Sequence, residues 1–236
     1  MFTKIRIFLL VIMAALLVPT VYAQEWTRTG DIELRRDVEL LKTYDIIDGP
    51  VNTWPLSWKQ ITTGINNTEA KSFPAHVMRA IERTRAKSPH KEWRFSSDLR
   101  LTNDPLLVRG FGDTARSDAD ITLSAAYQSG KIDANLAANF RDGYNGSDIT
   151  LDGSYIATNL GNWSLYGGAI DRWWGPGQDN TLLLSSNARP MASIGLRRDE
   201  PKAFKTKWLS WMGPWTWDMF LAHMGKERYI PNAFMV

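Results

Sequence analysis

The sequence predicts a mainly β fold, an antiparallel β-barrel of the outer-membrane type that follows a small N-terminal α-helical domain. Three observations indicate this fold class. Residues 1–23 have the pattern of an export signal, residues 24–91 carry apolar side chains at helical spacing, and residues 92–236 alternate apolar and polar side chains. The predicted division of the chain is therefore a signal peptide, a helical domain and a set of barrel strands.

The N-terminus has the parts of a cleavable signal peptide. Lys4 and Arg6 precede an apolar run over 7–18, and Ala23 ends a small-residue cleavage site. The run is too short for a membrane-spanning helix, which needs about 20 apolar residues. Its removal leaves one more basic than acidic residue, so the high isoelectric point does not indicate nucleic-acid binding. The sequence thus predicts export, and the exported chain has no cysteine for a disulfide.

Two segments of the helical domain have one apolar face each. Asp31 and Pro74 stand where these helices would begin. Ser57 and Gln60 have the spacing of a capping box, in which two side chains satisfy free backbone N–H groups at a helix start. The apolar faces consist of Leu34, Val38 and Leu41 and of Val77, Ile81 and Thr84.

From Trp93 onward the period of the apolar side chains changes to two, which is typical of half-buried β-strands. The residues that share a face in successive strands are Trp93, Phe95, Leu99 and Leu101; Ala119, Ile121, Leu123, Ala125 and Tyr127; Ile132, Ala134, Leu136, Ala138 and Phe140; Ile149, Leu151, Gly153, Tyr155 and Ala157; Trp163, Leu165, Gly167 and Ala169; and Trp215, Trp217, Met219 and Leu221. Weaker patterns over 181–185, 191–198 and 207–211 bring the expected number to nine strands.

A membrane barrel and a soluble sandwich both alternate, so the period does not separate them. The barrel is favoured because the predicted strands are nearly as long as a tilted membrane strand, which has about 9–11 residues. The opposite face is mostly Asp, Asn, Ser and Thr, and Tyr127, Phe140 and Trp163 lie near strand ends like an aromatic girdle. The sandwich remains the alternative fold.

Connection lengths predict the orientation, because outer-membrane barrels have short periplasmic turns and long external loops. The short connections are 129–130, 159–161 and 213–214, and the long ones are 102–117, 142–147, 171–180, 199–206 and 225–230. This alternation places the helical domain in the periplasm and the long connections outside the cell.

Patterns that support catalysis are missing from the sequence. There is no nucleophile elbow, phosphate-binding loop or dinucleotide glycine pattern, and the three histidines lack metal-ligand spacing. We therefore expect no cofactor, no metal and no enzymatic activity. The alternative from the enzyme class is a polysaccharide hydrolase or lyase, because glycosidases use two carboxylates beside stacked sugar rings. The carboxylates that could serve are Asp171, Asp179, Asp199 and Glu200.

Two clusters of basic and aromatic residues are candidate polysaccharide contacts. Tryptophan can stack on a sugar ring, arginine can pair with a uronic acid, and a basic loop collects acidic polymers. Tryptophans near strand ends are more often interface anchors than sugar platforms, and a charge run is usually a solvated face. The candidates are Arg172, Trp173 and Trp174 in one connection and Arg197, Arg198, Lys202 and Lys205 in a segment expected on the external side.

Five segments of the chain resemble the Wzi family of capsule-assembly outer-membrane proteins. They occur in family order over most of the chain after the leader, at 34–37, 49–58, 169–177, 187–190 and 197–204. The resemblance implies a surface-polysaccharide partner, commonly an acidic capsule, and no reaction chemistry. It also implies a closed barrel of about 18 strands, an even number as in other single-chain barrels. The nine strands expected here would then be its N-terminal half.

The sequence therefore predicts an outer-membrane surface lectin that binds, anchors and organises exported capsular polysaccharide. Half a barrel would expose unpaired strand edges to lipid, so we expect a missing C-terminal half or a second copy to complete it. No nucleic-acid partner is expected. The alternative function is a porin-like channel, whose lumen would be lined by Asp120, Thr122, Asp133, Asn135, Asp148, Thr150 and Asp152.

Overall fold

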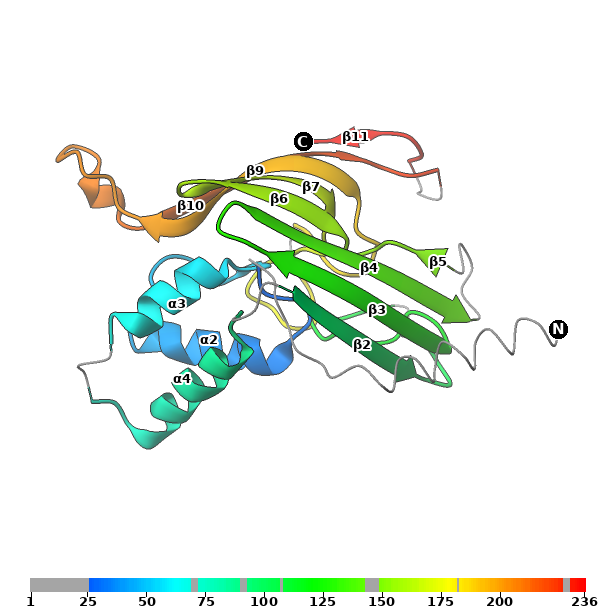
Figure 1. Ribbon diagram of the computed structural model, residues 1–236, viewed down its shortest axis with the longest axis horizontal. Helices are drawn as coiled ribbons and strands as arrows, with labels where there is room; N and C mark the ends of the chain where they lie inside the picture. The colour runs from blue at the N-terminus through cyan, green and yellow to red at the C-terminus, as the bar shows by residue number, and fades with distance from the viewer. Residues whose placement is uncertain are drawn as a thin grey trace.

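The computed structural model describes residues 26–68, 72–89, 93–106, 108–142, 149–181, 183–226 and 230–236. It contains a curved antiparallel sheet with three helices at one of its ends (Figure 1). The predicted signal peptide at 1–23 lies outside the described residues, as does Asp148. A mainly β architecture with a few helices agrees with the fold class predicted from the sequence.

The described helices are α2 (Ile32–Thr43), α3 (Trp58–Asn66) and α4 (Ala75–Lys87). They begin where the sequence indicates. The Asp31 carboxylate caps α2 by accepting a hydrogen bond from the Leu34 N–H at 2.9 Å, the Ser57 hydroxyl caps α3, and α4 starts directly after Pro74. Among the described residues, no helix is both long and apolar enough to cross a membrane.

The predicted capping box is wrong in its second half. Ser57 accepts a hydrogen bond from the Lys59 N–H at 3.2 Å, but the buried Gln60 side chain does not return to the cap. Its amide instead donates to the carbonyl oxygens of Asp48 (2.7 Å) and Pro50 (3.1 Å). Gln60 therefore satisfies backbone carbonyls of the loop that leads into β1, which a purely local pattern does not reveal.

The helices and β1 share one apolar core with two distant parts of the chain, which contribute Phe111 and Trp173. Trp54 lies in β1 (Thr53–Trp54) and Trp173 in β8 (Trp173–Trp174); the two short strands pair, and neither ring has exposed surface. Phe111 packs edge-on against both rings, with centroids 5.1 and 5.9 Å away. Helix residues in this core include Leu34, Val38, Leu41, Ile61, Ile65, Val77 and Ile81. The core thus contains both predicted apolar faces and closes only with residues from the sheet connections.

Arg35 ties this core to the connection that carries β8. Its side chain is almost fully buried, and its guanidinium lies 4.4 Å from the centre of the Phe111 ring. It donates to the Glu39 carboxylate and to the Pro176 carbonyl oxygen, both at 2.7 Å. A buried cation needs such partners, because leaving it unpaired is strongly destabilising. Arg35 therefore fixes α2 against a segment 141 residues later in the chain.

The large sheet has nine described strands, and neighbouring strands in it are antiparallel. Their order is β11-β10-β9-β7-β6-β4-β3-β2, with β5 paired to β4 beside that path. The strands are β2 (Trp93–Leu101), β3 (Ala119–Gln128), β4 (Ile132–Asp142), β5 (Ile149–Thr150), β6 (Tyr155–Leu160), β7 (Trp163–Ala169), β9 (Ala192–Lys202), β10 (Trp215–His223) and β11 (Phe234–Met235). Within the described residues the sheet is open, with β2 and β11 at its edges.

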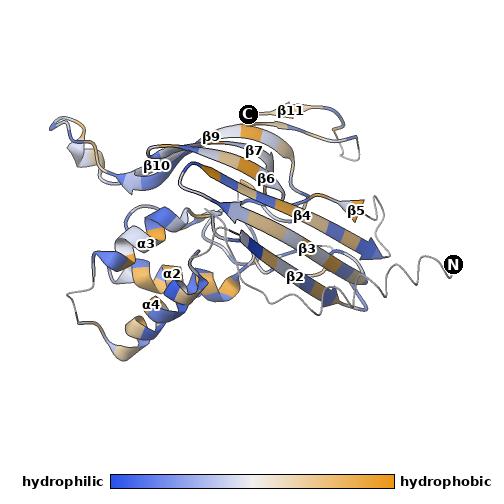
Figure 2. Ribbon diagram, viewed as in Figure 1, coloured by the Kyte–Doolittle hydropathy of each residue, from blue (hydrophilic) through white to orange (hydrophobic). Residues whose placement is uncertain are grey.

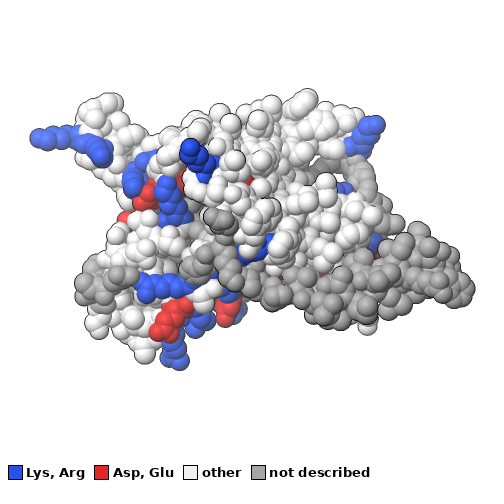
Figure 3. Space-filling model, in the orientation of Figure 1, with Lys and Arg blue, Asp and Glu red and all other residues white. Residues whose placement is uncertain are grey.

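The sheet is apolar on its outer side and polar on its inner side. Leu136, Ile156 and Ile194 are each about three-fifths exposed, whereas Asp133 and Asn139 are buried. Apolar and polar residues alternate along β3 and β4 (Figure 2), and the face of the sheet turned to the viewer carries few charged side chains (Figure 3). An apolar exposed face and a polar inner face are the arrangement expected of a barrel strand set, whereas a soluble sandwich would bury its apolar face.

The prediction of one continuous strand face over 149–157 is wrong. The segment contains two separate strands, β5 and β6, joined by a turn in which Gly153 adopts a φ of 89°. The turn changes which residues face inward: Ile149 is exposed, but Tyr155 and Ala157 are buried on the inner side. Glycine accepts a positive φ without steric cost, so Gly153 permits this change of register.

Two of the weaker predicted strands are not found among the residues that the structure describes. Leu184, in the segment 181–185, forms only an isolated bridge to Trp174. The segment 207–211 lies in a loop that contains the short 3₁₀ helix η1 (Ser210–Met212). The third weak strand, 191–198, is confirmed as β9. The number of strands still agrees with the expectation because β5 and β11 take the places of the two absent ones.

Connections lie at two opposite ends of the sheet. The end with the helices, here called the helical end, carries the turns 129–131 and 161–162 and the loop 203–214. Lys59 of α3 donates there to the Gly161 carbonyl oxygen at 2.9 Å. The other end, here called the far end, carries the connections 102–118, 170–191 and 224–233. The prediction that 199–206 lies with the long external loops is therefore wrong, because without a strand at 181–185 the next strand, β9, runs toward the helical end and carries this segment there.

Gly64 allows α3 to approach the preceding loop closely. A Cβ atom at this position would lie 2.4 Å from the Ile46 carbonyl oxygen. We expect Gly64→Ala to lower the free energy of unfolding by about 1–3 kcal/mol, because overpacking outweighs the helix propensity that alanine gains. Urea unfolding followed by circular dichroism measures this. Gly130→Ala is the control, since no atom lies within 4 Å of its Cβ position; equal stability of the two variants would contradict the close approach.

Candidate functional site

A polar cavity lies on the inner face of the sheet at β2, β3 and β4. Small side chains leave the space: the hydroxyl oxygens of Ser96 and Ser124 are 2.6 Å apart on neighbouring strands, and Ala137 follows in the same row. The cavity has a volume of about 140 Å³, and an adjoining one of about 430 Å³ extends toward the helices. The residues that line both are Trp26, Arg28, Gly30, Asp98, Arg100 and Asp113.

Segments from outside the sheet close over this inner face. Trp26 packs on Tyr155 of β6, with ring centroids 5.0 Å apart. The Thr29 hydroxyl donates to the Asp171 carbonyl oxygen at 2.8 Å, which joins the chain before α2 to the connection after β7. Polar side chains and these segments therefore cover much of the inner face that the structure describes.

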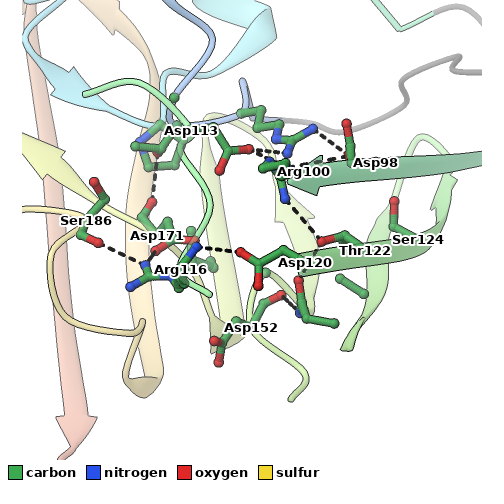
Figure 4. Close-up of a pocket in the computed structure, with 18 of the residues that line it drawn as sticks. Asp98, Arg100, Asp113, Arg116, Asp120, Thr122, Ser124, Asp152, Asp171 and Ser186 are labelled. Carbon is green, nitrogen blue, oxygen red and sulfur yellow. Dashed lines mark hydrogen bonds and ion pairs between the residues drawn. The ribbon is translucent and has the colours of Figure 1, made fainter. Parts of the chain in front are cut away.

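Asp113 is the centre of the ion pairs at the mouth of the cavity (Figure 4). Its carboxylate binds Arg28, Arg100 at 2.6 Å and Arg109 at 3.6 Å. Arg28 also reaches Asp98 at 2.8 Å, so the loop that carries Asp113 is linked to β2 and to the chain before α2. One carboxylate thereby holds three segments together.

The ion pairs set the pKa values of these loop residues. Burial would raise the pKa of Asp113, but the three arginines outweigh it and hold that pKa below its usual value. Burial, and then the neighbouring Arg116, lowers the pKa of Arg109 to about 10. Asp113 is therefore ionised at neutral pH, and the network is complete there.

Arg116 joins the loop after β2 to the connection after β7. Its backbone N–H donates to the Asp120 carboxylate at 2.6 Å, and its guanidinium donates to the Ser186 carbonyl oxygen at 2.8 Å. The guanidinium also lies 3.6 Å from the Asp171 carboxylate. Burial raises the pKa of Asp171, while Arg116 partly opposes this. Arg116 consequently closes the far end of the cavity.

Asp152 holds the third part of the network. Arg141 of β4 and Arg189 each lie 3.0 Å from its carboxylate, and Arg141 also lies 3.6 Å from Asp120. The Asn139 amide donates to the Asp152 carbonyl oxygen at 2.9 Å. These contacts bind the β5–β6 turn and the segment before β9 to the floor of the cavity.

The lining is balanced in charge, with five arginines and five aspartates around the cavity. In the part of the chain that the structure describes, no group of His, Cys, Asp and Glu side chains could hold a metal ion. Arginine supplies several N–H donors in a fixed plane, and carboxylates supply acceptors. Such a lining can hydrogen-bond a hydroxyl-rich ligand without a strong net attraction to either sign of charge.

The far-end residues of this site fall within a region shared with known proteins. The sequence model of the family described as capsule assembly protein Wzi matches residues 98–236, which is more than half of the chain. The chain belongs to the Wzi family. This confirms the resemblance found in the sequence.

Two relatives give the extent of the likeness. A Klebsiella pneumoniae protein, described as an uncharacterized 55.8 kDa protein in the cps region, is 28% identical over 210 residues, covering 88% of this chain and 42% of that protein. The solved structure of Escherichia coli Wzi, described as an outer-membrane, carbohydrate-binding β-barrel involved in group 1 capsule assembly, matches with a TM-score of 0.76 and 27% identity. That match covers 88% of this chain and 47% of the other. The chain thus spans about half the length of both relatives.

Of the sequence-predicted Arg172, Trp173 and Trp174, the structure buries the first two and leaves Trp174 half-buried. Trp173 has no exposed surface, and its indole N–H donates to the Gly177 carbonyl oxygen at 2.9 Å. Its interpretation as a sugar platform is therefore wrong. Arg172 is buried against Phe220, 4.0 Å from the ring centre, and Trp174 meets the same ring edge-on at 5.8 Å. Arg172 and Trp174 therefore pack against the inner face of the sheet, whereas Trp173 belongs to the helical core.

Arg197 and Arg198 occupy opposite faces of β9 and neither is in an external loop. Arg197 is buried on the inner side, 5.8 Å from the centre of the Trp26 ring. Arg198 lies on the outer side, 3.8 Å from the Trp215 ring, and donates to the Trp215 carbonyl oxygen at 2.7 Å. Strand alternation separates consecutive residues in this way, so the run does not form one basic patch.

Lys202 and Lys205 are exposed, but they lie at the helical end. The Lys202 ammonium is 2.8 Å from the Glu200 carboxylate, and Lys205 is in the loop 203–214. The structure therefore does not bring the seven candidate residues together. Their expected external position is wrong because, without a strand at 181–185, β9 runs toward the helical end.

The carboxylates considered for a glycoside hydrolase are also dispersed. Asp199 accepts hydrogen bonds from Ser164 at 2.5 Å and from the Trp26 indole at 3.4 Å near the helical end. Asp171 belongs to the cavity network at the far end, and Asp179 is exposed in a connection. No two of these described carboxylates flank one open site, as hydrolysis between two carboxylates requires.

Only part of the cavity could be predicted from the amino-acid sequence. Asp120, Thr122 and Asp152 were expected in a lumen because they alternate with apolar residues. The arginines that complete the network were missed, since Arg28, Arg109, Arg116 and Arg189 lie in connections where no period exists. The row of inward-facing carboxylates could have indicated these arginines, because buried carboxylates need cations from elsewhere in the fold.

The ion pairs of Asp113 predict a pH dependence of stability. Its pKa is lower in the folded than in the unfolded chain, so the pairs stabilise the fold above about pH 4 and lose this effect as the pH falls through the folded-state pKa. We expect Asp113→Asn to lower the free energy of unfolding near neutral pH by about 0.5–1 kcal/mol, as for a partly exposed ion-pair network, and to flatten the loss on acidification. Urea midpoints across the acid range measure this, and the exposed Asp118→Asn in the same loop is the control. An unchanged acid slope in Asp113→Asn would refute the assignment.

The burial of Trp173 predicts a structural role. Trp173→Ala should lower the free energy of unfolding by about 3–5 kcal/mol, because it leaves a large cavity in the helical core. Thermal unfolding followed by near-ultraviolet circular dichroism reports the loss. Trp211→Ala removes the same ring from a position that is 80% exposed and should leave folding nearly unchanged. Similar melting of the two variants would show that Trp173 does not close the core.

Proposed function

We propose that this chain binds exported capsular polysaccharide at the outer membrane and helps to anchor and organise it on the cell surface. The observation that carries the proposal is the polar inner face of a sheet that is apolar outside and matches E. coli Wzi, a carbohydrate-binding barrel, with a TM-score of 0.76. Membership of the Wzi family supports the role in capsule assembly. Arginine and carboxylate pairs hydrogen-bond sugar hydroxyls well, which suits the charge-balanced cavity.

The proposed contact surface is the far-end rim, formed by the loop segments 112–118 and 185–190. Asn187 and Ala188 are exposed there, and Arg189 is partly exposed beside Asp152. Arg116 joins the two loops through the Ser186 and Asn187 carbonyl oxygens, at 2.8 and 3.1 Å. Because both loops are held from below, the rim offers polar groups in a fixed arrangement, which reduces the entropy lost on binding.

A porin-like channel is the second candidate, because the inner face is polar. The ion pairs of Asp113 and Asp152 cross the space that ions would use, and the segment that carries Trp26 packs over Tyr155. These contacts oppose steady conduction. A hydrolase is opposed by the dispersal of the candidate carboxylates.

Binding of capsular polysaccharide to the folded protein tests the proposal. We expect Asn187→Ala combined with Arg189→Gln to weaken binding at least about tenfold, the effect of losing hydrogen bonds that include a charged donor. Surface plasmon resonance with polymer from the producing strain measures the dissociation constant, and heat-modifiable migration reports folding. The control is Lys205→Gln combined with Lys207→Gln, which removes charge from the opposite end of the sheet. Loss of binding in the control but not in the rim variant would place the polymer elsewhere.

A second rim variant tests whether the polymer is acidic. Ala188 is exposed, and its side chain makes no hydrogen bond, so Ala188→Asp adds charge without removing a contact. An acidic polymer should bind this variant more weakly, and the difference should shrink as salt screens the charges over roughly 8–10 Å. Unchanged binding at low salt would indicate a neutral polymer.

A further inference from the structure

The loop 203–214, between β9 and β10, projects from the helical end beyond the rest of the sheet (Figure 1). Its apolar side chains point into solvent: Trp208 is 74% exposed, Trp211 is 80% exposed and Met212 is 50% exposed. Lys205 and Lys207 are exposed in the same loop, and neither ammonium group forms an ion pair with any residue that the structure describes. Two large indoles beside two unpaired cations form an amphipathic surface with no described occupant.

The loop has a defined shape, so its exposed tryptophans are held in place. Phe204 stacks on Trp215 at its base, with ring centroids 4.9 Å apart and planes inclined by 20°. Within the loop, the N–H of Leu209 donates to the Thr206 carbonyl oxygen at 3.0 Å, and η1 ends in a hydrogen bond from Gly213 to Ser210 at 3.2 Å. The base is therefore packed on the sheet while the tip is held away from it.

The loop continues the apolar outer face of the sheet. Trp217, Met219 and Leu221 follow it along β10 with nearly half of each side chain exposed. Trp163 meets the Trp217 ring edge-on, with centroids 5.6 Å apart, at the same end. In a Wzi-type barrel this outer face contacts lipid, so the loop stands where the lipid-facing wall ends. Tryptophan is favoured at that depth because one end of its ring is apolar and the other donates a hydrogen bond.

We propose that the loop 203–214 docks on the membrane leaflet at the helical end, with Trp208 and Trp211 at the level of the lipid headgroups. Lys205 and Lys207 then pair with the phosphates of anionic phospholipids. Lysine can extend its ammonium to the headgroups while its stem lies along apolar surface, so the two residue types suit one interface. The loop thereby anchors the β9–β10 end of the wall beside the helices.

Other occupants fit the loop less well. A second copy docked symmetrically on this surface would bring Lys205 and Lys207 of both chains together, and like charges at an interface disfavour association. A capsular polymer on the far-end rim is at the opposite end of the sheet. An anionic lipid surface is complementary to the lysines and to the indoles at once.

A fluorescent probe on the loop tests this docking. The chain has no cysteine, so Ser210→Cys gives one labelling site at the exposed tip for an environment-sensitive nitrobenzoxadiazole dye. The folded protein is extracted from outer membranes and placed in phosphatidylcholine vesicles with and without phosphatidylglycerol, containing lipids brominated near the headgroup. We expect a blue-shifted emission and strong quenching by the bromines. A label at Gly130→Cys, in a turn at the same end with no atom within 4 Å, should remain water-exposed.

Paired variants separate the two parts of the surface. Trp208→Ser combined with Trp211→Ser should reduce quenching of the Ser210→Cys label in both kinds of vesicle. Lys205→Gln combined with Lys207→Gln should abolish only the extra quenching that phosphatidylglycerol gives. Leu106→Ser combined with Val108→Ser, which changes two exposed apolar residues at the far end, should have no effect. A label at 210 that stays in water, equal quenching at 130 and 210, or protection that rises with protein concentration would each overturn the proposal, the last by assigning the surface to a second copy.

Discussion

The pairing of arginine with aspartate on the inner face is the constraint on which the rest of the sheet depends. The outer face is apolar, so the polar half of each strand must be buried on the other side. A buried charge without a partner destabilises a fold strongly, whereas a paired and hydrogen-bonded one is tolerated. The strands supply Asp98 and Asp120, and Arg141 of β4 pairs with Asp120. Arg28, from the chain before α2, pairs with Asp98, and Arg189, from the connection before β9, pairs with Asp152. The connections are therefore structural parts of the wall as well as links between strands.

The molecule has two kinds of interior because its sheet is apolar on the outer side and polar on the inner side. Under the helices, the core is mainly apolar and includes Trp54, Phe111 and Trp173. Over β2 to β4, the interior is a lattice of ion pairs in which Asp113 and Asp152 each hold more than one arginine. Arg35 lies between the two, with its guanidinium over an aromatic ring and on a backbone carbonyl. Residues from the same connections serve both interiors, so neither forms independently of the other.

Local patterns predicted the parts of this fold that local physics determines. The caps at Asp31 and Ser57 and the alternation along β3 and β4 follow from neighbouring residues, and they are found as expected. Gly153 was read as one member of a strand because its positive φ is a property of the folded chain. That turn moves Tyr155 to the inner side, which a count of alternate residues cannot detect.

The candidate site was predicted less well, because its members come together only in three dimensions. Trp173 was considered a sugar platform on the strength of its glycine-rich neighbourhood, yet residues from α2 and β1 surround it. Arg197 and Arg198 looked like one basic patch until strand geometry placed them on opposite faces. The cavity itself exists because Ser96, Ser124 and Ala137 have small side chains. No functional motif in the sequence contains these residues.

The link from Arg35 to Pro176 has a consequence for the order of assembly. The two residues are separated by 141 positions, and the core under α2 includes Trp173 from the same connection. During synthesis and export, the helices emerge long before the residues that complete their core. Closing so long a segment carries a large entropic cost before its contacts form, and such non-local topologies fold slowly. The apolar faces of the helices therefore stay partly exposed to water until the chain as far as β8 has been exported and can pack against them.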